Sequence, residues 1–312
     1  MIWYFLLSLH FIVEILGVMS HLIFIQAVVF QGIMDVYCRI HLGIISLSML
    51  TMLVGFVAET LVCLTIGTVF EDDQCAQIPL KQLLLCVHRY AEMLSLASQL
   101  FFTIERVLSV KFSRIHKSVS YKLLFSMALF LENLFSIIYM FTNVFYPEQT
   151  GIFWLLTLQI IIFANFPFVY YAKRASKSKY TADVTTYSLR RKHNLYNYYE
   201  IARSFVFSTA IYLVAQLTVF TLLWLYVAEL LFAENFHKLL FINSLIWNTN
   251  LTAFPWIVML IHRGQRERIY KVWNHLFPNA KDPNEILGMD GKVMLTTPTQ
   301  TDYFDQLKKA WE

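Results

Sequence analysis

Charged side chains are scarce in this sequence. Asp, Glu, Lys and Arg make up 15% of its 312 residues, whereas a soluble globular domain carries roughly 25%. Apolar residues make up 57% of the chain, and its mean hydropathy is +0.53. These values exclude a water-soluble domain and indicate a fold whose outer surface faces lipid. Glycine is also rare, with nine residues, and no Gly/Ser-rich linker, internal repeat or low-complexity segment marks a second folded domain.

Cysteine is equally sparse. The four cysteines, Cys38, Cys63, Cys75 and Cys86, match neither the spacing of a zinc site nor that of a disulfide framework. A local pairing of Cys75 with Cys86 stays open, but we expect buried free thiols. The sequence contains no H-x-x-x-H or H-E-x-x-H motif, and we expect no metal and no other cofactor.

The apolar residues fall into seven long runs. They lie near 3–30, 42–69, 82–107, 122–145, 152–171, 205–232 and 239–262. A helix of about 20 apolar residues crosses the hydrocarbon core of a bilayer, so each run is long enough. The first run lacks the basic start of a secretory signal peptide, and we assign it to the first span. The sequence therefore predicts an all-α membrane protein with a seven-transmembrane helix bundle over residues 1–262.

A different pattern follows the seventh span. Over 263–277 the large apolar residues recur on one face, and Arg266, Arg268 and Lys271 lie off it. This pattern predicts an amphipathic helix on the inner membrane surface. Residues 278–312 are polar, and we expect them to form a cytoplasmic tail.

Lysine and arginine are unevenly distributed about the spans. One set of flanks, together with the tail, holds 22 of the 25 basic residues, while the opposite flanks hold only Lys81 and Lys238. Cytoplasmic loops carry the excess of positive charge, so we expect an outside amino terminus and a cytoplasmic carboxy terminus. The basic residues do not gather on one face, so the expected partner is the lipid bilayer and not a nucleic acid.

The third predicted span carries a polar stripe on one helical face. Polar residues along the length of a span must face the protein interior, where they mark functional sites. The candidate ligand contacts lie on this face, beside it, or on one face of the seventh span: His88, Arg89, Glu92, Gln99, Asn243 and Trp247. The alternative for the outer end of the third span is an Arg89–Glu92 ion pair that only fixes helix packing.

Candidate switch residues lie nearer the inner ends of the same two spans. Glu105 and Arg106 stand where the third span meets a basic loop, and such a pair can hold the arginine until the helices rearrange. The alternative is an interfacial arginine that extends to water. In the seventh span, Pro255 follows Asn250 and removes a backbone hydrogen bond. The resulting kink is either a hinge for activation or a structural feature.

Three short motifs accompany this architecture. They are Ile104-Glu105-Arg106-Val107-Leu108-Ser109 at the end of the third span, Ser188-Leu189 with Lys192-His193-Asn194 before the sixth, and Phe254-Pro255-Trp256 before the basic tail. Together they resemble the nematode serpentine chemoreceptors, G-protein-coupled receptors of the superfamily that includes the Sra, Srb and Sre classes. Asn197-Tyr198 stand where that family has Glu-Asn, which leaves the class open. The loop 146–151 has no cysteine, so the disulfide that joins the third span to this loop in other receptor families cannot form.

The resemblance implies a receptor without enzymatic activity. An external small-molecule cue would bind among the spans, and a heterotrimeric G protein would be activated inside, with Glu105, Arg106, Asn250 and Pro255 as the switch. It also implies a location in the plasma membrane, and within it in the ciliary membrane of a sensory neuron. Three alternatives remain: a seven-span metal-dependent hydrolase, an odorant-gated channel of inverted topology, and a transporter. The distribution of basic residues argues against the channel, and the few glycines show no matching breaks in two repeats.

Overall fold

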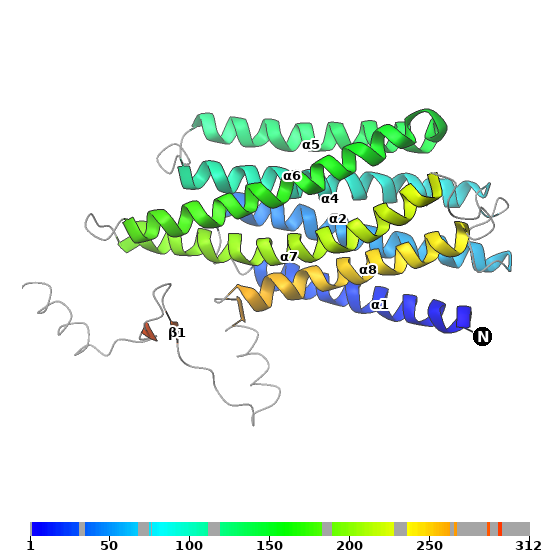
Figure 1. Ribbon diagram of the computed structural model, residues 1–312, viewed down its shortest axis with the longest axis horizontal. Helices are drawn as coiled ribbons and strands as arrows, with labels where there is room; N and C mark the ends of the chain where they lie inside the picture. The colour runs from blue at the N-terminus through cyan, green and yellow to red at the C-terminus, as the bar shows by residue number, and fades with distance from the viewer. Residues whose placement is uncertain are drawn as a thin grey trace, which may run out of the picture. The chain divides into compact units, whose positions relative to one another are not determined.

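The fold was analysed in a computed structural model. It describes residues 2–30, 35–67, 75, 77–111, 119–182, 189–227, 236–262, 265–266, 286–287 and 293–294. Seven of its helices are long and apolar enough to cross a membrane (Figure 1), which confirms the predicted all-α seven-helix bundle. The helices are α1 (Ile2–Phe24, continued by the π-helical turn η1, Ile25–Phe30), α2 (Val36–Thr65), α4 (Pro79–Lys111), α5 (Val119–Phe145), α6 (Pro147–Ala182), α7 (Leu189–Val227) and α8 (Phe236–Ile261).

The chain divides into two compact units, Met1–Arg266 and Glu267–Glu312. The first unit contains the bundle. In the second, the described residues form one short antiparallel pair, β1 (Ile286–Leu287) with β2 (Val293–Met294). The predicted amphipathic helix over 263–277 lies outside the described residues, apart from Gln265 and Arg266, and so does most of the predicted tail over 278–312.

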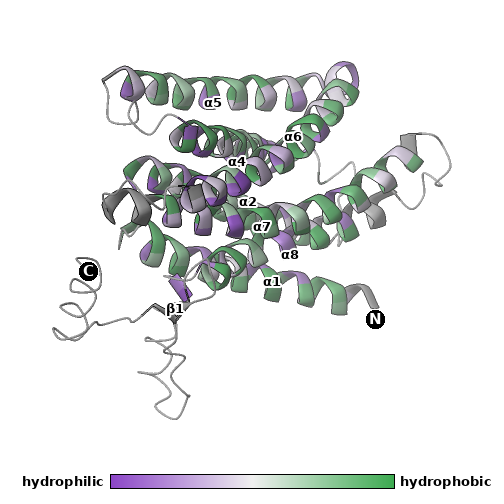
Figure 2. Cartoon of the chain, turned by 60° about the vertical axis from the view of Figure 1, so that its left-hand side comes forward, coloured by the Kyte–Doolittle hydropathy of each residue, from purple (hydrophilic) through white to green (hydrophobic). Residues whose placement is uncertain are grey.

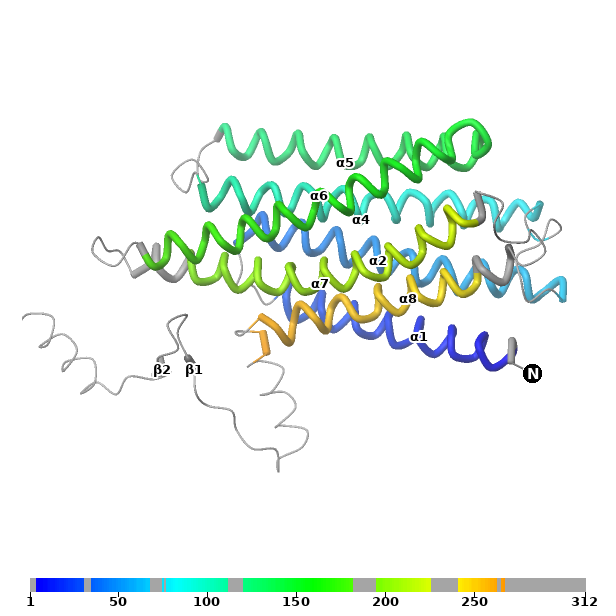
Figure 3. Tube along the Cα trace, in the orientation of Figure 1, coloured from blue at the N-terminus to red at the C-terminus, as the bar shows by residue number. Residues whose placement is uncertain are grey.

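Helix α4, the third span, lies at the centre of the bundle. It contacts α2, α5, α6 and α7, while α1 packs between α2 and α8 and closes the ring. Figure 3 traces the chain through these helices in the same orientation as Figure 1. In the most apolar stretch of α4, 67% of the residues are buried, against 22% in α5. This difference follows from sequence, because the polar stripe of α4 has to be kept away from lipid.

The outer faces of the bundle are apolar. Large exposed side chains such as Leu124, Phe130 and Phe141 cover α5, and Figure 2 shows predominantly hydrophobic residues along α1 and α5. In water such a surface would be a large unprotected patch. In a bilayer it is the expected lipid contact.

The predicted helix ends need correction on the side of the bundle that carries most of the basic residues. The segment 173–204 is predicted as a loop because it is polar, but α6 continues to Ala182 and α7 begins at Leu189. Hydropathy locates the part of a helix that lies in lipid, and Lys, Arg and Ala continue a helix well beyond it. On the opposite side α5 and α6 are separated by Tyr146 alone, because Pro147 is suited to the first position of a helix.

Helix α1 approaches its neighbours most closely at Gly17. A Cβ atom placed there would lie 2.5 Å from Oγ1 of Thr252 and 2.7 Å from Cδ1 of Leu53. A larger residue at this position would therefore require the side chains of Thr252 and Leu53 to shift, and glycine lets α1 pack against α2 and α8 without that change.

A proline in α8 is compensated from α1. Pro255 lies inside the helix and cannot donate to the carbonyl of Leu251, four residues before it. Nε2 of His21 lies 3.0 Å from that carbonyl oxygen, and its Nδ1 lies 2.8 Å from Oγ of Ser46. The network fits a histidine that donates from Nε2 and accepts at Nδ1. His21 thus satisfies the backbone group freed by the proline and ties α1 and α2 to it.

Candidate functional site

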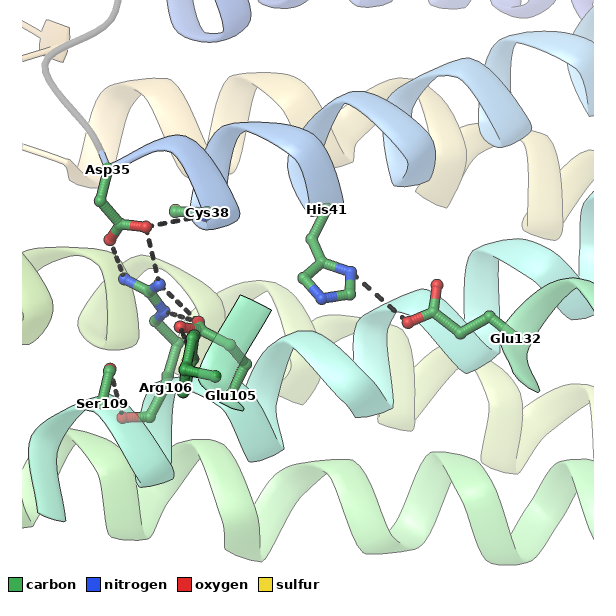
Figure 4. Close-up of polar contacts among 8 residues, drawn as sticks. Asp35, Cys38, His41, Glu105, Arg106, Ser109 and Glu132 are labelled. Carbon is green, nitrogen blue, oxygen red and sulfur yellow. Dashed lines mark hydrogen bonds and ion pairs between the residues drawn. The ribbon is translucent and has the colours of Figure 1, made fainter. Parts of the chain in front are cut away.

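Arg106 is the central residue of a buried ionic cluster at the end of α4. Its side chain is almost fully buried, and its guanidinium donates through Nη1 to Oδ2 of Asp35 at 2.8 Å and through Nη2 to Oδ1 at 3.2 Å. It also forms an ion pair with Glu105, its neighbour in the chain. Two carboxylates from different segments therefore surround one guanidinium (Figure 4). The bidentate pairing with Asp35 holds the guanidinium of Arg106 in a fixed position.

Local structure places Asp35 for this role. The residue is the N-cap of α2, with extended backbone angles and a carboxylate oxygen that accepts from the backbone N–H of Cys38 at 3.0 Å. Capping by Asp is favourable because it satisfies a helix N–H that has no intrahelical partner. The carboxylate of Asp35 thus both starts α2 and binds Arg106.

Two further helices contribute to the cluster. The hydroxyl of Tyr121, from α5, donates to Oε1 of Glu105 at 2.6 Å. The guanidinium carbon of Arg106 lies 5.2 Å from the ring centre of Tyr198, from α7, and 5.6 Å from that of Phe102. These are cation–π distances. The cluster around Arg106 thus joins residues of α4, α5 and α7 to the N-cap of α2, so movement of these helices relative to one another would alter its contacts.

Helix α6 also reaches this end of α4. Nζ of Lys179 donates to the backbone carbonyl of Val110 at 2.7 Å and lies 3.3 Å from that of Lys111. A cation at the carboxy end of a helix satisfies carbonyls that have no intrahelical partner. The polar extension of α6 is therefore joined to the same end of α4 as the Arg106 cluster.

A second buried acid–base pair lies deeper in the bundle. Nδ1 of His41, on α2, lies 3.6 Å from Oε1 of Glu132, on α5 (Figure 4). Ser98 of α4 donates to the other carboxylate oxygen at 2.6 Å. Both His41 and Glu132 are fully enclosed, which joins α2, α4 and α5 by polar contacts in a region where lipid offers none.

Two of the predicted site residues line one small cavity. Gln99 of α4 and Asn250 of α8 border a space of about 10 Å³ together with side chains of α2 and α7. That is about the room that one water molecule needs. The cavity is also lined by Met49, Ser208, Ile211, Tyr212, Phe254 and Ile257.

The other predicted ligand contacts lie elsewhere. Arg89 and Glu92 form an ion pair at 2.8 Å, and the Tyr139 hydroxyl donates to the same carboxylate at 2.9 Å. This is the internal Arg89–Glu92 pair named above as the alternative, and through Tyr139 it also contacts α5. His88 instead pairs with Glu59 of α2 at 2.9 Å.

The two predicted contacts on α8 differ in their surroundings. The ring of Trp247 packs against that of Tyr212, with 5.5 Å between ring centres. Asn243 is buried, and among the described residues neither its Oδ1 nor its Nδ2 has a hydrogen-bond partner. A buried amide of this kind needs a water or a ligand to satisfy it.

The expectation of free thiols is wrong for two of the four cysteines. Cys63, near the end of α2, forms a disulfide with Cys75, and their Cα atoms lie 5.3 Å apart. Cys38 and Cys86 form no disulfide. The sequence spacing of 12 residues does not reveal the pair, because spacing along the chain does not show which cysteines lie close together in space. The bridge lies at the opposite end of α2 from Asp35.

Comparisons with known proteins do not assign the chain to a family. No protein-family model matches the chain, and no curated protein matches it at a significant level. Within the described part of the chain, no three His, Cys, Asp or Glu side chains gather as they would to hold a metal ion. The seven helices make this a multi-pass membrane protein of receptor-like or transporter-like architecture.

Proposed function

We propose that this protein is a G-protein-coupled receptor for an external small molecule. The observation that carries the proposal is Arg106, a buried guanidinium held between Asp35 and Glu105 at the end of the central span. Burying an ion pair in this way costs free energy that simple apolar packing would not. The cluster joins several helices and is costly to bury. We therefore interpret it as a contact that forms in one state of the bundle and breaks in another.

The proposed resting state is the arrangement described above. In it, Asp35 and Glu105 neutralise Arg106, and the ring of Tyr198 keeps α7 against the cluster. In the active state, α7 moves away and Arg106 leaves Asp35. Its guanidinium then becomes available to a heterotrimeric G protein that binds between α4 and the cytoplasmic extensions of α6 and α7.

The ligand would act from within the bundle, on the disulfide side of Arg106. Asn243 and Trp247 of α8 and Gln99 of α4 are its proposed contacts, and Asn243 supplies an amide whose polar atoms are unsatisfied among the described residues. The cavity beside Gln99 has room for about one water, so a ligand can enter only if α7 and α8 separate from α4. Entry is thereby coupled to movement, and the ligand favours the state in which the helices are apart.

The proposed orientation places the amino terminus outside. The flanks at the Asp35 end carry most of the basic residues, as cytoplasmic flanks do. The Cys63–Cys75 disulfide lies at the other end, and disulfides persist in oxidising surroundings outside the cell. Charge and redox chemistry thus independently favour the same orientation in the plasma membrane.

The chemosensory assignment rests on the resemblance to nematode serpentine chemoreceptors. The Glu105-Arg106 block that carries the resemblance is also the centre of the ionic cluster. We infer a role in sensory perception of a chemical cue, in the ciliary membrane of a sensory neuron, with no enzymatic activity.

Ligand-independent nucleotide exchange tests the proposal without knowledge of the ligand. Membranes that contain the wild-type protein or a variant are mixed with purified G-protein trimers, and binding of a non-hydrolysable GTP analogue is measured. We expect low exchange for the wild type, several-fold higher exchange for Asp35→Asn, and only background for Arg106→Ala. Lys122→Ala is the control, because this exposed basic residue lies on α5, outside the surface proposed for the G protein. If Asp35→Asn stays at background with every G-protein class, the switch assignment is wrong.

A further inference from the structure

The end of the bundle that carries the disulfide holds two buried histidine–glutamate pairs. Nδ1 of His88 lies 2.9 Å from Oε1 of Glu59, and Nδ1 of His10 lies 3.4 Å from Oε1 of Glu14. All four residues come from the first three spans. None of these contacts takes part in the Arg106 switch, which lies at the opposite end of the same helices.

The two pairs form one cluster. The ring of Phe56 lies between them, with ring centres 4.2 Å from His88 and 6.3 Å from His10. The carboxylates of Glu14 and Glu59 are close enough to interact electrostatically. We call His10, Glu14, Glu59 and His88, with the ring of Phe56, the histidine–glutamate cluster.

Other polar groups face this cluster from every neighbouring helix. From α4 come Arg89 and Glu92, which pair with each other. From α5, Tyr139 donates to Glu92, and Tyr212 of α7 interacts electrostatically with the same carboxylate. From α8, Nδ2 of Asn248 donates to Glu14 at 2.9 Å and lies 3.1 Å from Nε2 of His10, with Oγ of Ser244 at 3.4 Å from the same atom.

The charge balance of this region is incomplete. Among the groups named above, three glutamates and one arginine carry a formal charge of −2 while the two histidines are neutral. A net charge inside a membrane bundle is costly, and Glu14 is fully buried, with its Oε2 lacking a hydrogen-bond partner among the described residues. One proton taken up by each pair removes the imbalance. Whether it resides on the imidazole or the carboxyl group, each pair binds it as a unit.

We propose that the histidine–glutamate cluster is a proton-binding site through which external acidity stabilises the packed arrangement of α1, α2, α4 and α8. The proton is the ligand that this geometry fits, because in each pair a His nitrogen lies within 3.4 Å of a Glu oxygen, and a proton between them can reside on either atom. The inference concerns the disulfide end of the bundle and stands independently of G-protein coupling.

The pH dependence of unfolding tests this site. In the unfolded chain, exposed histidine and glutamate are both unprotonated above about pH 6.5, whereas the proposed site still holds its protons there while the protein is folded. The folded protein then binds more protons than the unfolded chain, so its stability falls as pH rises above that value. For each such proton, the unfolding equilibrium constant changes about ten-fold per pH unit. We expect this slope in the purified wild-type protein in lipid nanodiscs, unfolded thermally at a series of pH values.

Variants assign the slope to the cluster. The double variant Glu14→Gln/Glu59→Gln keeps the side-chain shape and should lose most of the slope, and His88→Asn alone should lose about half. His262→Asn is the control, because burial lowers the pKa of His262 to about 4, and it stays neutral over the range used. The His41–Glu132 pair remains in every variant and cancels from the comparison.

Two results would overturn the proposal. One is a wild-type protein whose unfolding does not vary with pH above about 6.5, which requires no variant to fold. The other is a double glutamine variant with the same slope as the wild type. Neither result touches the receptor proposal, whose test is nucleotide exchange.

Discussion

Arg106 and Asp35, 71 positions apart in the chain, meet through two hydrogen bonds of 2.8 and 3.2 Å. The pair joins the end of the central helix to the beginning of α2. It is also asymmetric, because the arginine is enclosed while Asp35 retains 26% exposure of its side chain. Asp35 is therefore the partner that can separate from the pair and be solvated at little cost.

Replacing Asp35 by Asn should therefore favour the active state. The amide keeps the N-cap of α2, since Asn caps as well as Asp, but it withdraws the charge that holds Arg106. We expect basal nucleotide exchange to rise several-fold, with a loss of stability of about 1–3 kcal/mol from the weakened charged hydrogen bonds. Asp35→Glu provides the control, because it retains a carboxylate. Equal basal activity in both variants would mean that the charge of Asp35 does not restrain Arg106.

Replacing Arg106 by Ala should abolish coupling for a different reason. It removes the proposed G-protein contact and leaves the carboxylates of Glu105 and Asp35 facing each other without a cation. The second effect destabilises the fold, and buried charges that lose their partner cost about 3–5 kcal/mol. The triple variant Glu105→Gln/Arg106→Ala/Asp35→Asn relieves the repulsion, so it should recover surface expression but not nucleotide exchange. Recovery of exchange as well would remove Arg106 from the mechanism.

The sequence predicts the bundle well and the contacts within it poorly. Long apolar runs locate all seven helices, because lipid permits little else. The polar stripe of α4 likewise identifies the helix that has to be central. Asp35, however, is an ordinary helix cap in the sequence, and nothing local links it to Arg106. Its role depends on how α2 and α4 are placed, which periodicity within one helix does not specify.

The same limit applies to the residues of the two histidine–glutamate pairs and to His21. In the sequence His10, Glu14, His21 and Glu59 are single polar residues in apolar runs, and His88 belongs to a polar stripe; for both patterns, packing and function make the same prediction. Pro255 predicts a free carbonyl at Leu251, but not that a histidine from α1 would satisfy it. Fold class follows from the composition of single helices, whereas these sites follow from the alignment of two or three.

His21 and Pro255 should behave as an energetically coupled pair. His21→Ala leaves the carbonyl of Leu251 without its partner at 3.0 Å, and a buried unsatisfied group costs about 1–3 kcal/mol. Pro255→Ala restores the backbone N–H that the helix lacks, so His21→Ala should cost much less in that background. A double-mutant cycle of thermal stability measures the coupling. Additive effects within about 0.5 kcal/mol would show that His21 does not compensate for the proline.

The disulfide gives a prediction about stability and sidedness together. Cys63→Ser/Cys75→Ser removes a bridge that closes a loop of 12 residues, and bridges over loops of this length stabilise by about 2–4 kcal/mol. In intact cells, a membrane-impermeant maleimide should label the wild-type protein only after treatment with an impermeant reductant, and the double serine variant should lose that labelling. Cys86→Ser should leave the reductant-dependent labelling in place. Labelling of Cys63 and Cys75 only after the cells are permeabilised would put the disulfide end inside the cell. The Arg106 cluster would then lie outside, where no G protein could reach it.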